Sequence, residues 1–222
     1  MKNHFKRIIS VLLSAALLLA TAVLPVYAEE PPTQVAEEAS EAVARISLCS
    51  TIYFFPVVGH EWIYVENLTD EPLTVGFYEL MPGEGVSIGC FSVTVADGWG
   101  VYYNVEAFRE NRDENLGNCR SVTEDLTAEG LKKLSDALYN YHNFWGIYCN
   151  CMFFAFSIWN AATDNFLIPL IIPALGHLQV MICGGEKGVL EMYEPSTEEI
   201  FRQKGTGRNA TLVPVSELTL KN

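Results

Sequence analysis

Short runs of apolar or alternating residues, divided by turn-forming residues, make up most of the chain between residues 46 and 107. Runs of this length that end at Pro, Gly, Asn or Asp are typical of strands joined by tight turns. The pattern predicts five β-segments in an antiparallel meander, at residues 46–55, 61–66, 73–80, 85–95 and 99–107.

The second half of the sequence has helical patterns. After a polar loop at 111–118, Thr127 is placed to cap a helix that runs to about Tyr141, with three leucines on one face. Residues 151–162 are apolar on nearly every face, which predicts a buried helix. A short helix at 174–182 and a strand at 189–193 follow, and from about residue 195 the chain is polar with little pattern.

The first 28 residues have the three parts of a secretory signal. Three basic residues precede an apolar stretch at 8–24, and Ala28 ends a small-x-small cleavage site. An uncleaved anchor is the alternative, and the Ser, Thr and Pro residues in the stretch weaken it. The sequence therefore predicts a signal peptide (1–28), a flexible leader (29–44) and one domain (45–222), secreted or associated with the cell envelope without a stable membrane anchor.

Charge narrows the choice of partners. The whole chain has a net charge of −13, and removing the three basic residues of the signal leaves 11 − 27 = −16. A surface this acidic argues against nucleic acid and anionic membranes as partners, because both require positive charge. No Lys or Arg lies between residues 46 and 108, where eight acids occur. His60 lies in this acidic stretch, which would favour cationic ligands over anionic ones. The simpler interpretation is that most of these acids lie on solvated strand faces and turns.

Two residues suggest nucleophilic chemistry. Cys151 opens the predicted buried helix, where unpaired backbone N–H groups and the helix dipole favour a thiolate. His60 opens an apolar strand about ninety residues earlier, and a nucleophile and its base are commonly far apart in sequence. Taken singly, a buried cysteine is more often part of a core, and a histidine at a strand end is more often a surface residue.

The residues around both positions resemble a known family. Residues 59–67 read GHEWIYVEN, and residues 150–160 combine Asn150-Cys151-x-x-Phe154-Ala155 with a later Trp-Asn pair. Both resemble permuted, NlpC-like papain-fold proteins, whose architecture lecithin:retinol acyltransferase shares. The strands between them, with Val75-Gly76-x-Tyr78 and Tyr103-Asn104-Val105-Glu106, resemble those of one secreted bacterial branch. In that family the histidine strand precedes the cysteine helix. The resemblance implies an α+β, papain-like fold, with an antiparallel sheet packed against a buried helix that has the cysteine at its N-terminus.

The resemblance also implies a mechanism. His60 would take the proton of Cys151, and the thiolate would attack an amide or ester to form an acyl-enzyme. The implied substrate is a cell-wall peptide or a lipid, with no cofactor. Independently of the resemblance, the His and Cys spacings fit no zinc site, so no metal is expected.

The third catalytic group is not where the family pattern places it. Phe77 stands at the expected polar position and cannot orient an imidazole. The sequence leaves four candidates for that role: Asn67, Tyr78, Glu79 and Glu106. His142 and His177 are weaker candidates for the site, and helix packing is the simpler interpretation of His177.

Two other classes of function remain open. The domain is a catalytically silent binding module if the triad has decayed, as Phe77 suggests. It is a disulfide-stapled structural protein if Cys151 is bridged, since an even number of cysteines, six, allows fifteen pairings. The oligomeric state is left open.

Overall fold

The computed structural model describes residues 41–54, 58–92, 98–110, 116, 119–146, 148–170, 172–188 and 190–215. They belong to the larger of two units into which the chain divides, Ser40–Asn222. The predicted signal peptide and nearly all of the predicted leader lie outside the described residues.

Alternating burial on two long strands sets the frame of the sheet. In β1 (Ala44–Phe54), Ala44, Ile46 and Leu48 are fully buried on one face, and Cys49 is fully buried on the other. β1 pairs with β2 (Val58–Asn67) antiparallel, with Ser50 opposite Glu61 and Cys49 opposite Trp62. Because successive side chains of a strand point to opposite faces, this register decides which residues of the two strands meet.

Eight described strands form one sheet in the order β10-β9-β6-β5-β2-β1-β7-β8, and each adjacent pair is antiparallel. The remaining bounds are β5 (Gly85–Phe91), β6 (Gly100–Tyr103), β7 (Arg120–Leu126), β8 (Glu186–Lys187), β9 (Phe201–Lys204) and β10 (Thr211–Pro214). A separate hairpin consists of β3 (Leu73–Val75) and β4 (Tyr78–Leu80). The described chain is therefore an α+β domain with an antiparallel sheet.

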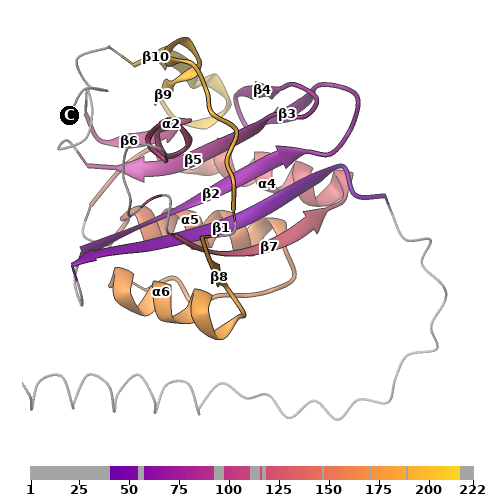
Figure 1. Cartoon of the computed structure of the whole chain (residues 1–222). Coiled ribbons are helices and arrows are strands. Elements are labelled where there is room, and N and C mark those ends of the chain that lie inside the picture. Colours follow the sequence, from indigo (N-terminus) through magenta and orange to yellow (C-terminus); the bar gives the residue numbers. More distant parts are fainter. Residues whose placement is uncertain are drawn as a thin grey trace, which may run out of the picture. The chain divides into compact units, whose positions relative to one another are not determined.

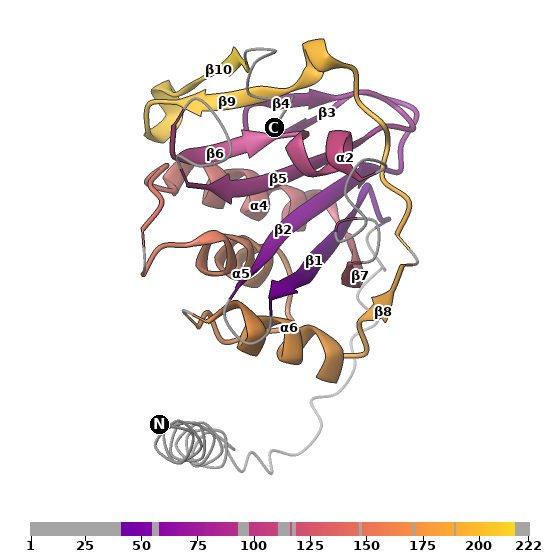
Figure 2. The ribbon, with the colours of Figure 1, turned by 60° about the vertical axis from the view of Figure 1, so that its left-hand side comes forward.

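Helices cover both faces of the sheet. α4 (Ala128–Asn140) packs on α5 (Cys151–Ala162), which lies against β2 and β5 (Figure 1). α6 (Pro173–Ile182) lies against β1, β2 and β7, and the short α2 (Val105–Arg109) covers β5 on the opposite face (Figure 2). The larger core fills the space between the sheet and α4 and α5, and a smaller core around Trp62 and Tyr64 lies on the other face.

Most of the predicted elements are present. The strands predicted at 46–55, 61–66 and 85–95 correspond to β1, β2 and β5, and the helices at 127–141, 151–162 and 174–182 to α4, α5 and α6. Thr127 caps α4 as expected, accepting from the Gly130 N–H. The segment predicted at 73–80 is a hairpin rather than one strand, because Gly76 turns the chain at a φ of 59°. The segment predicted at 99–107 ends early as β6 and continues into α2.

The largest differences concern the polar parts of the sequence. β7 was not predicted, although it pairs with the whole first half of β1. Residues 201–214, predicted to be a tail of low signal, form β9 and β10 and extend the sheet beyond β6. The prediction of a strand at 189–193 is wrong for residues 190–193, which have no strand structure. The strand in this region is instead β8, where Glu186 and Lys187 pair with β7. Nowhere in the described ranges is a helix both long enough and apolar enough to cross a bilayer.

Candidate functional site

Cys151 is the first residue of α5. The Asn150 side chain caps the helix by accepting the Phe153 N–H at 3.0 Å, and Asn150 itself has an extended backbone. Only 7% of Cys151 is exposed, because α5 is enclosed between the sheet and its neighbouring helices. The thiol is therefore at a helix N-terminus, as predicted, but inside the core.

The partner of this thiol is a carboxyl group. Cys151 Sγ donates to Glu61 Oε2 at 3.5 Å, and Glu61 is fully buried on β2. Burial raises the pKa of Glu61 to about 8. Burial, and then the charge of Glu61, raise the pKa of Cys151 well above its ordinary value. The expected lowering of the thiol pKa by the helix N-terminus is thus outweighed, and both groups are mainly protonated at neutral pH.

The structure does not bring His60 to Cys151. His60 Nε2 lies 2.8 Å from Glu106 Oε1, and its ring stacks on Trp62 and packs against Phe91. His60 and Glu61 are adjacent on β2, so their side chains point to opposite faces of the sheet. The predicted thiol–imidazole contact is therefore not formed, and Glu61 takes the place that the base would occupy.

Of the four candidates for a third group, Glu106 is the one hydrogen-bonded to His60. It lies in the first turn of α2, on the far face of the sheet, and also accepts from the Ser87 hydroxyl at 3.0 Å. Asn67 holds the turn after β2, Tyr78 accepts a hydrogen bond from Asn104, and Glu79 is exposed. The imidazole is thus oriented by a carboxyl group as a triad requires, but on the wrong face for Cys151.

Phe77 has a packing role. It lies at the tip of the β3–β4 hairpin and contacts Tyr139 of α4 edge to face, with ring centroids 4.9 Å apart. It does not take part in the contacts of His60, and its position explains why an aromatic residue is suited to it.

A different histidine lies on the face of Cys151. The Ser50 hydroxyl donates to Glu61 Oε1 at 3.3 Å and lies 3.1 Å from His177 Nδ1 on α6. Burial, followed by the charge of Arg120, lowers the pKa of His177. Four polar groups thus form a chain: Cys151, Glu61, Ser50 and His177. His142, in the turn before the cysteine, is exposed.

Sequence reasoning missed Glu61 and Ser50 and undervalued His177. The signal for Glu61 is its place one residue after His60: if α5 packs on one face of the strand, only one of these two neighbours can face it. Ser50 follows from the pairing of β1 with β2, which places it directly opposite Glu61. The position of His177 depends on where α6 packs, for which the sequence contains no local signal.

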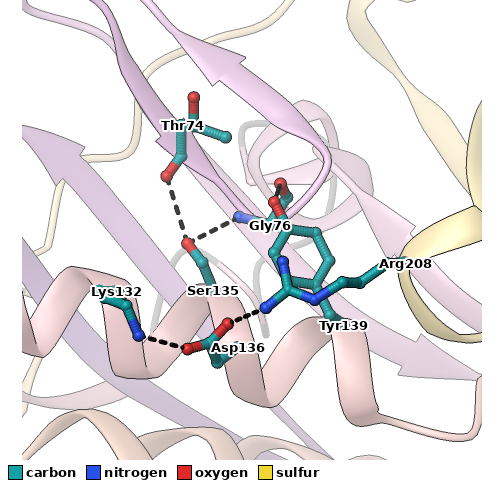
Figure 3. Close-up of polar contacts among 7 residues, drawn as sticks. All are labelled: Thr74, Gly76, Lys132, Ser135, Asp136, Tyr139 and Arg208. Carbon is teal, nitrogen blue, oxygen red and sulfur yellow. Dashed lines mark hydrogen bonds and ion pairs between the residues drawn. The ribbon is translucent and has the colours of Figure 1, made fainter.

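A second polar cluster lies at a cavity of about 400 Å³ between α4, β3 and the turn at residues 207–209. Its floor is apolar, and Lys132 and Arg208 both pair with Asp136 at its rim (Figure 3). The Ser135 hydroxyl donates to the Thr74 carbonyl and accepts the Gly76 N–H. The bonds of Ser135 thus hold the β3–β4 hairpin on α4, and the Asp136–Arg208 pair holds the turn at residues 207–209 on the same helix.

The six cysteines are unbridged in the structure. The thiol of Cys151 is hydrogen-bonded to Glu61. No group of three or more His, Cys, Asp or Glu side chains suited to a metal occurs in the part of the chain that is described.

Comparison with protein-family models, curated proteins and solved structures gives no match for this chain. Its fold class and the geometry at Cys151 are therefore the basis on which a function is proposed.

Proposed function

We propose that this chain is a secreted domain of the permuted papain-like class that binds its ligand without hydrolysing it. The observation that carries the proposal is the partner of Cys151, which is the buried carboxyl group of Glu61 and not an imidazole. A cysteine nucleophile reacts as the thiolate. Glu61, whose pKa is raised to about 8, supplies no positive charge that would stabilise a thiolate at Cys151. At higher pH its negative charge opposes thiolate formation.

The order of the elements supports the papain-like part of the proposal. The strand that contains His60 precedes the helix that begins at Cys151, and this helix packs on an antiparallel sheet. Both features agree with the expectation from the sequence resemblance. The substitution of a carboxyl group for the imidazole at the thiol is the change that would end catalysis while preserving the fold.

The ligand that we propose is a cell-wall peptide, which carries free amino groups. The acids of residues 46–108 that reach solvent include Glu66, Asp70, Glu71, Glu79 and Glu84, in the turns and strands near the β3–β4 hairpin. No Lys or Arg lies in that stretch, so a cationic or neutral ligand is preferred over an anionic lipid surface.

The test is the rate at which iodoacetamide labels each cysteine as a function of pH, read by peptide mass spectrometry. We expect Cys151 to react more slowly than the exposed Cys183 at pH 7 and to gain reactivity only as the pH rises well above neutral, because burial and the charge of Glu61 raise its pKa. Glu61→Gln should shift the Cys151 profile to lower pH, because it removes the charge that opposes the thiolate. His60→Ala should leave the profile unchanged.

One observation favours a thiol hydrolase instead. A carboxylate with a pKa of about 8 is a competent general base near neutral pH, and Ser50 links Glu61 to the half-buried His177. In that case Cys151 would label faster than Cys183 at pH 7, and Glu61→Gln would slow it. The two functions therefore predict opposite effects of the same substitution.

Ligand binding completes the test. Purified cell-wall peptide fragments should bind to the wild-type protein and to Cys151→Ser equally and be recovered uncleaved. Release of a cleaved fragment by the wild type alone would refute the silent module, and absence of binding to either protein would refute the choice of ligand.

A further inference from the structure

Two of the six cysteines are close neighbours across strands. In the β1–β7 register Cys49 lies opposite Ser121, and Cys119 is two residues before Ser121. Residues two apart on a strand share a face, so Cys49 and Cys119 lie on the same face as a diagonal cross-strand pair. The face is the one that bears Trp62 and Tyr64, opposite the face that Cys151 occupies.

Both thiols belong to the smaller core, with Cys49 fully buried and Cys119 4% exposed. Burial raises the pKa of Cys49 well above its usual value, and the contact with the Cys119 thiol is the next largest cause. Cys119 immediately precedes the first residue of β7. Its backbone forms hydrogen bonds with Leu116 and Gly188 rather than with β1. Its backbone is therefore free of the β1 ladder and can make the small adjustment that a disulfide requires.

The other four thiols have different surroundings. Cys90 belongs to the larger core and donates to the Phe144 carbonyl at 3.7 Å. Cys151 is bonded to Glu61, Cys149 is half-buried, and Cys183 is exposed at the end of α6. Cys49 and Cys119 are the two cysteines that share one hydrophobic core cluster.

We propose that Cys49 and Cys119 form a disulfide when the chain folds in an oxidising compartment, while the other four cysteines remain thiols. The bond would tie the middle of the sheet at β1 to the start of β7 across a sequence separation of 119 − 49 = 70 residues. This inference does not depend on the ligand or on the silence of Cys151, because neither thiol belongs to that site.

The oxidant is a small-molecule or protein disulfide, as in ordinary thiol–disulfide exchange. The Cys119 thiolate attacks one sulfur of the oxidant, forms a mixed disulfide and releases one thiol. The Cys49 thiolate then attacks the Cys119 sulfur, closes the bond and releases the second thiol. The two protons lost by the cysteines go to the two leaving thiolates, and the oxidant is reduced to two thiols. The exchange takes place during folding, before the smaller core closes over both residues.

The experiment has two samples of the full chain. One is recovered from the medium or envelope of a host that exports it, and the other is purified reduced and refolded in a glutathione redox buffer. Non-reducing peptide mapping should show a Cys49–Cys119 cross-link in both, and thiol titration of the denatured protein should count 6 − 2 = 4 free thiols. A cross-link found only in the redox buffer would support the Cys49–Cys119 bond and contradict the predicted export.

Variants test the specificity of the bond. Reduction of the wild type should lower Tm by about 5–15 °C, because a disulfide across a long loop restricts the unfolded chain. Cys119→Ser should lose this response to reductant, and Cys90→Ser, which removes another buried thiol, should keep it. Six free thiols in the redox buffer, or a bond from Cys49 to any other cysteine, would overturn the proposal. The mapping does not depend on the stability of the variants.

Discussion

At residues 60 and 61 the two faces of strand β2 each contain a buried carboxyl group with a different partner. On one face His60 is held by Glu106, and on the other Glu61 is held against Cys151. Each face has a carboxyl group, a partner and a serine hydroxyl, Ser87 on the first and Ser50 on the second. The two faces differ in the partner of the carboxyl group. An imidazole that takes the proton of a carboxyl group becomes positive and forms an ion pair with it. A thiol beside a carboxyl group has no positive form, so the two groups can only carry like negative charges.

A chain can contain the components of a catalytic site without bringing them together as one site. The chain contains a cysteine at a helix N-terminus, a histidine on a strand and an acid that orients the histidine. The alternation of β2 divides these components between two faces, so the histidine and its acid form a buried structural pair on one side. The thiol on the other side faces an acid that opposes its ionisation.

The strongest test of the His60 face is Glu106→Ala. Glu106 is fully buried and bonds both His60 and Ser87, so its loss leaves two buried polar groups without their partner. We expect the free energy of unfolding to fall by about 3–5 kcal/mol, measured by urea denaturation. The exposed Glu79→Ala is the matched control and should change it by less than about 0.5 kcal/mol. A small effect at Glu106 would mean that this pair is not structural.

The Glu61 face should respond to pH. Because the pKa of Glu61 is raised from 4.5 to about 8, the folded chain holds a proton that the unfolded chain releases between these values. The contribution of Glu61 therefore lowers stability as the pH rises from about 4.5 to about 8, by up to about 1.4 kcal/mol per pH unit. Glu61→Gln should flatten this slope in unfolding measurements at a series of pH values. An unchanged slope would show that Glu61 is ionised in the native protein.

Two glycines allow the packing of the faces to be compared. A Cβ at Gly89 would lie against Oε1 of the buried Glu106, whereas a Cβ at Gly176 would meet the flexible side chain of Met152. Gly89→Ala should therefore cost about 1–3 kcal/mol through overpacking. Gly176→Ala should cost less, because Met152 can move and alanine favours the α6 helix. Equal losses in thermal unfolding would contradict the difference between the faces.

The smallest expected effect is the absence of coupling between His60 and Cys151. In a double-mutant cycle of His60→Ala and Cys151→Ser, the unfolding free energies should add to within about 0.5 kcal/mol, since the residues share no partner. The cycle of His60→Ala and Glu106→Ala should instead show a coupling of about 1–3 kcal/mol. Coupling of His60 with Cys151 as large as that with Glu106 would place them in one site.

The reliability of the sequence-based predictions followed the strength of the local pattern. α4 and α5 were predicted nearly to the residue, because an amphipathic stretch with a capping Thr127 and an apolar stretch starting after Asn150 leave few alternatives. β9 and β10 were missed, because four-residue strands in a mostly polar stretch look like loops until a neighbour provides their hydrogen bonds. Cys151 was located correctly on its helix, but its partner was assigned to the wrong neighbour on β2.

The sequence by itself determined the three longest helices, the long strands β1, β2 and β5, their order, and the place of the thiol at the start of a buried helix. Periodicity and capping, which mark these elements, are local properties. Tertiary structure decided which face of β2 meets α5, and hence that Glu61 and not His60 faces Cys151. It also decided that burial outweighs the helix N-terminus in setting the pKa of the thiol. Both outcomes depend on how the sheet and helices pack and on the solvent that packing removes, neither of which a local pattern encodes.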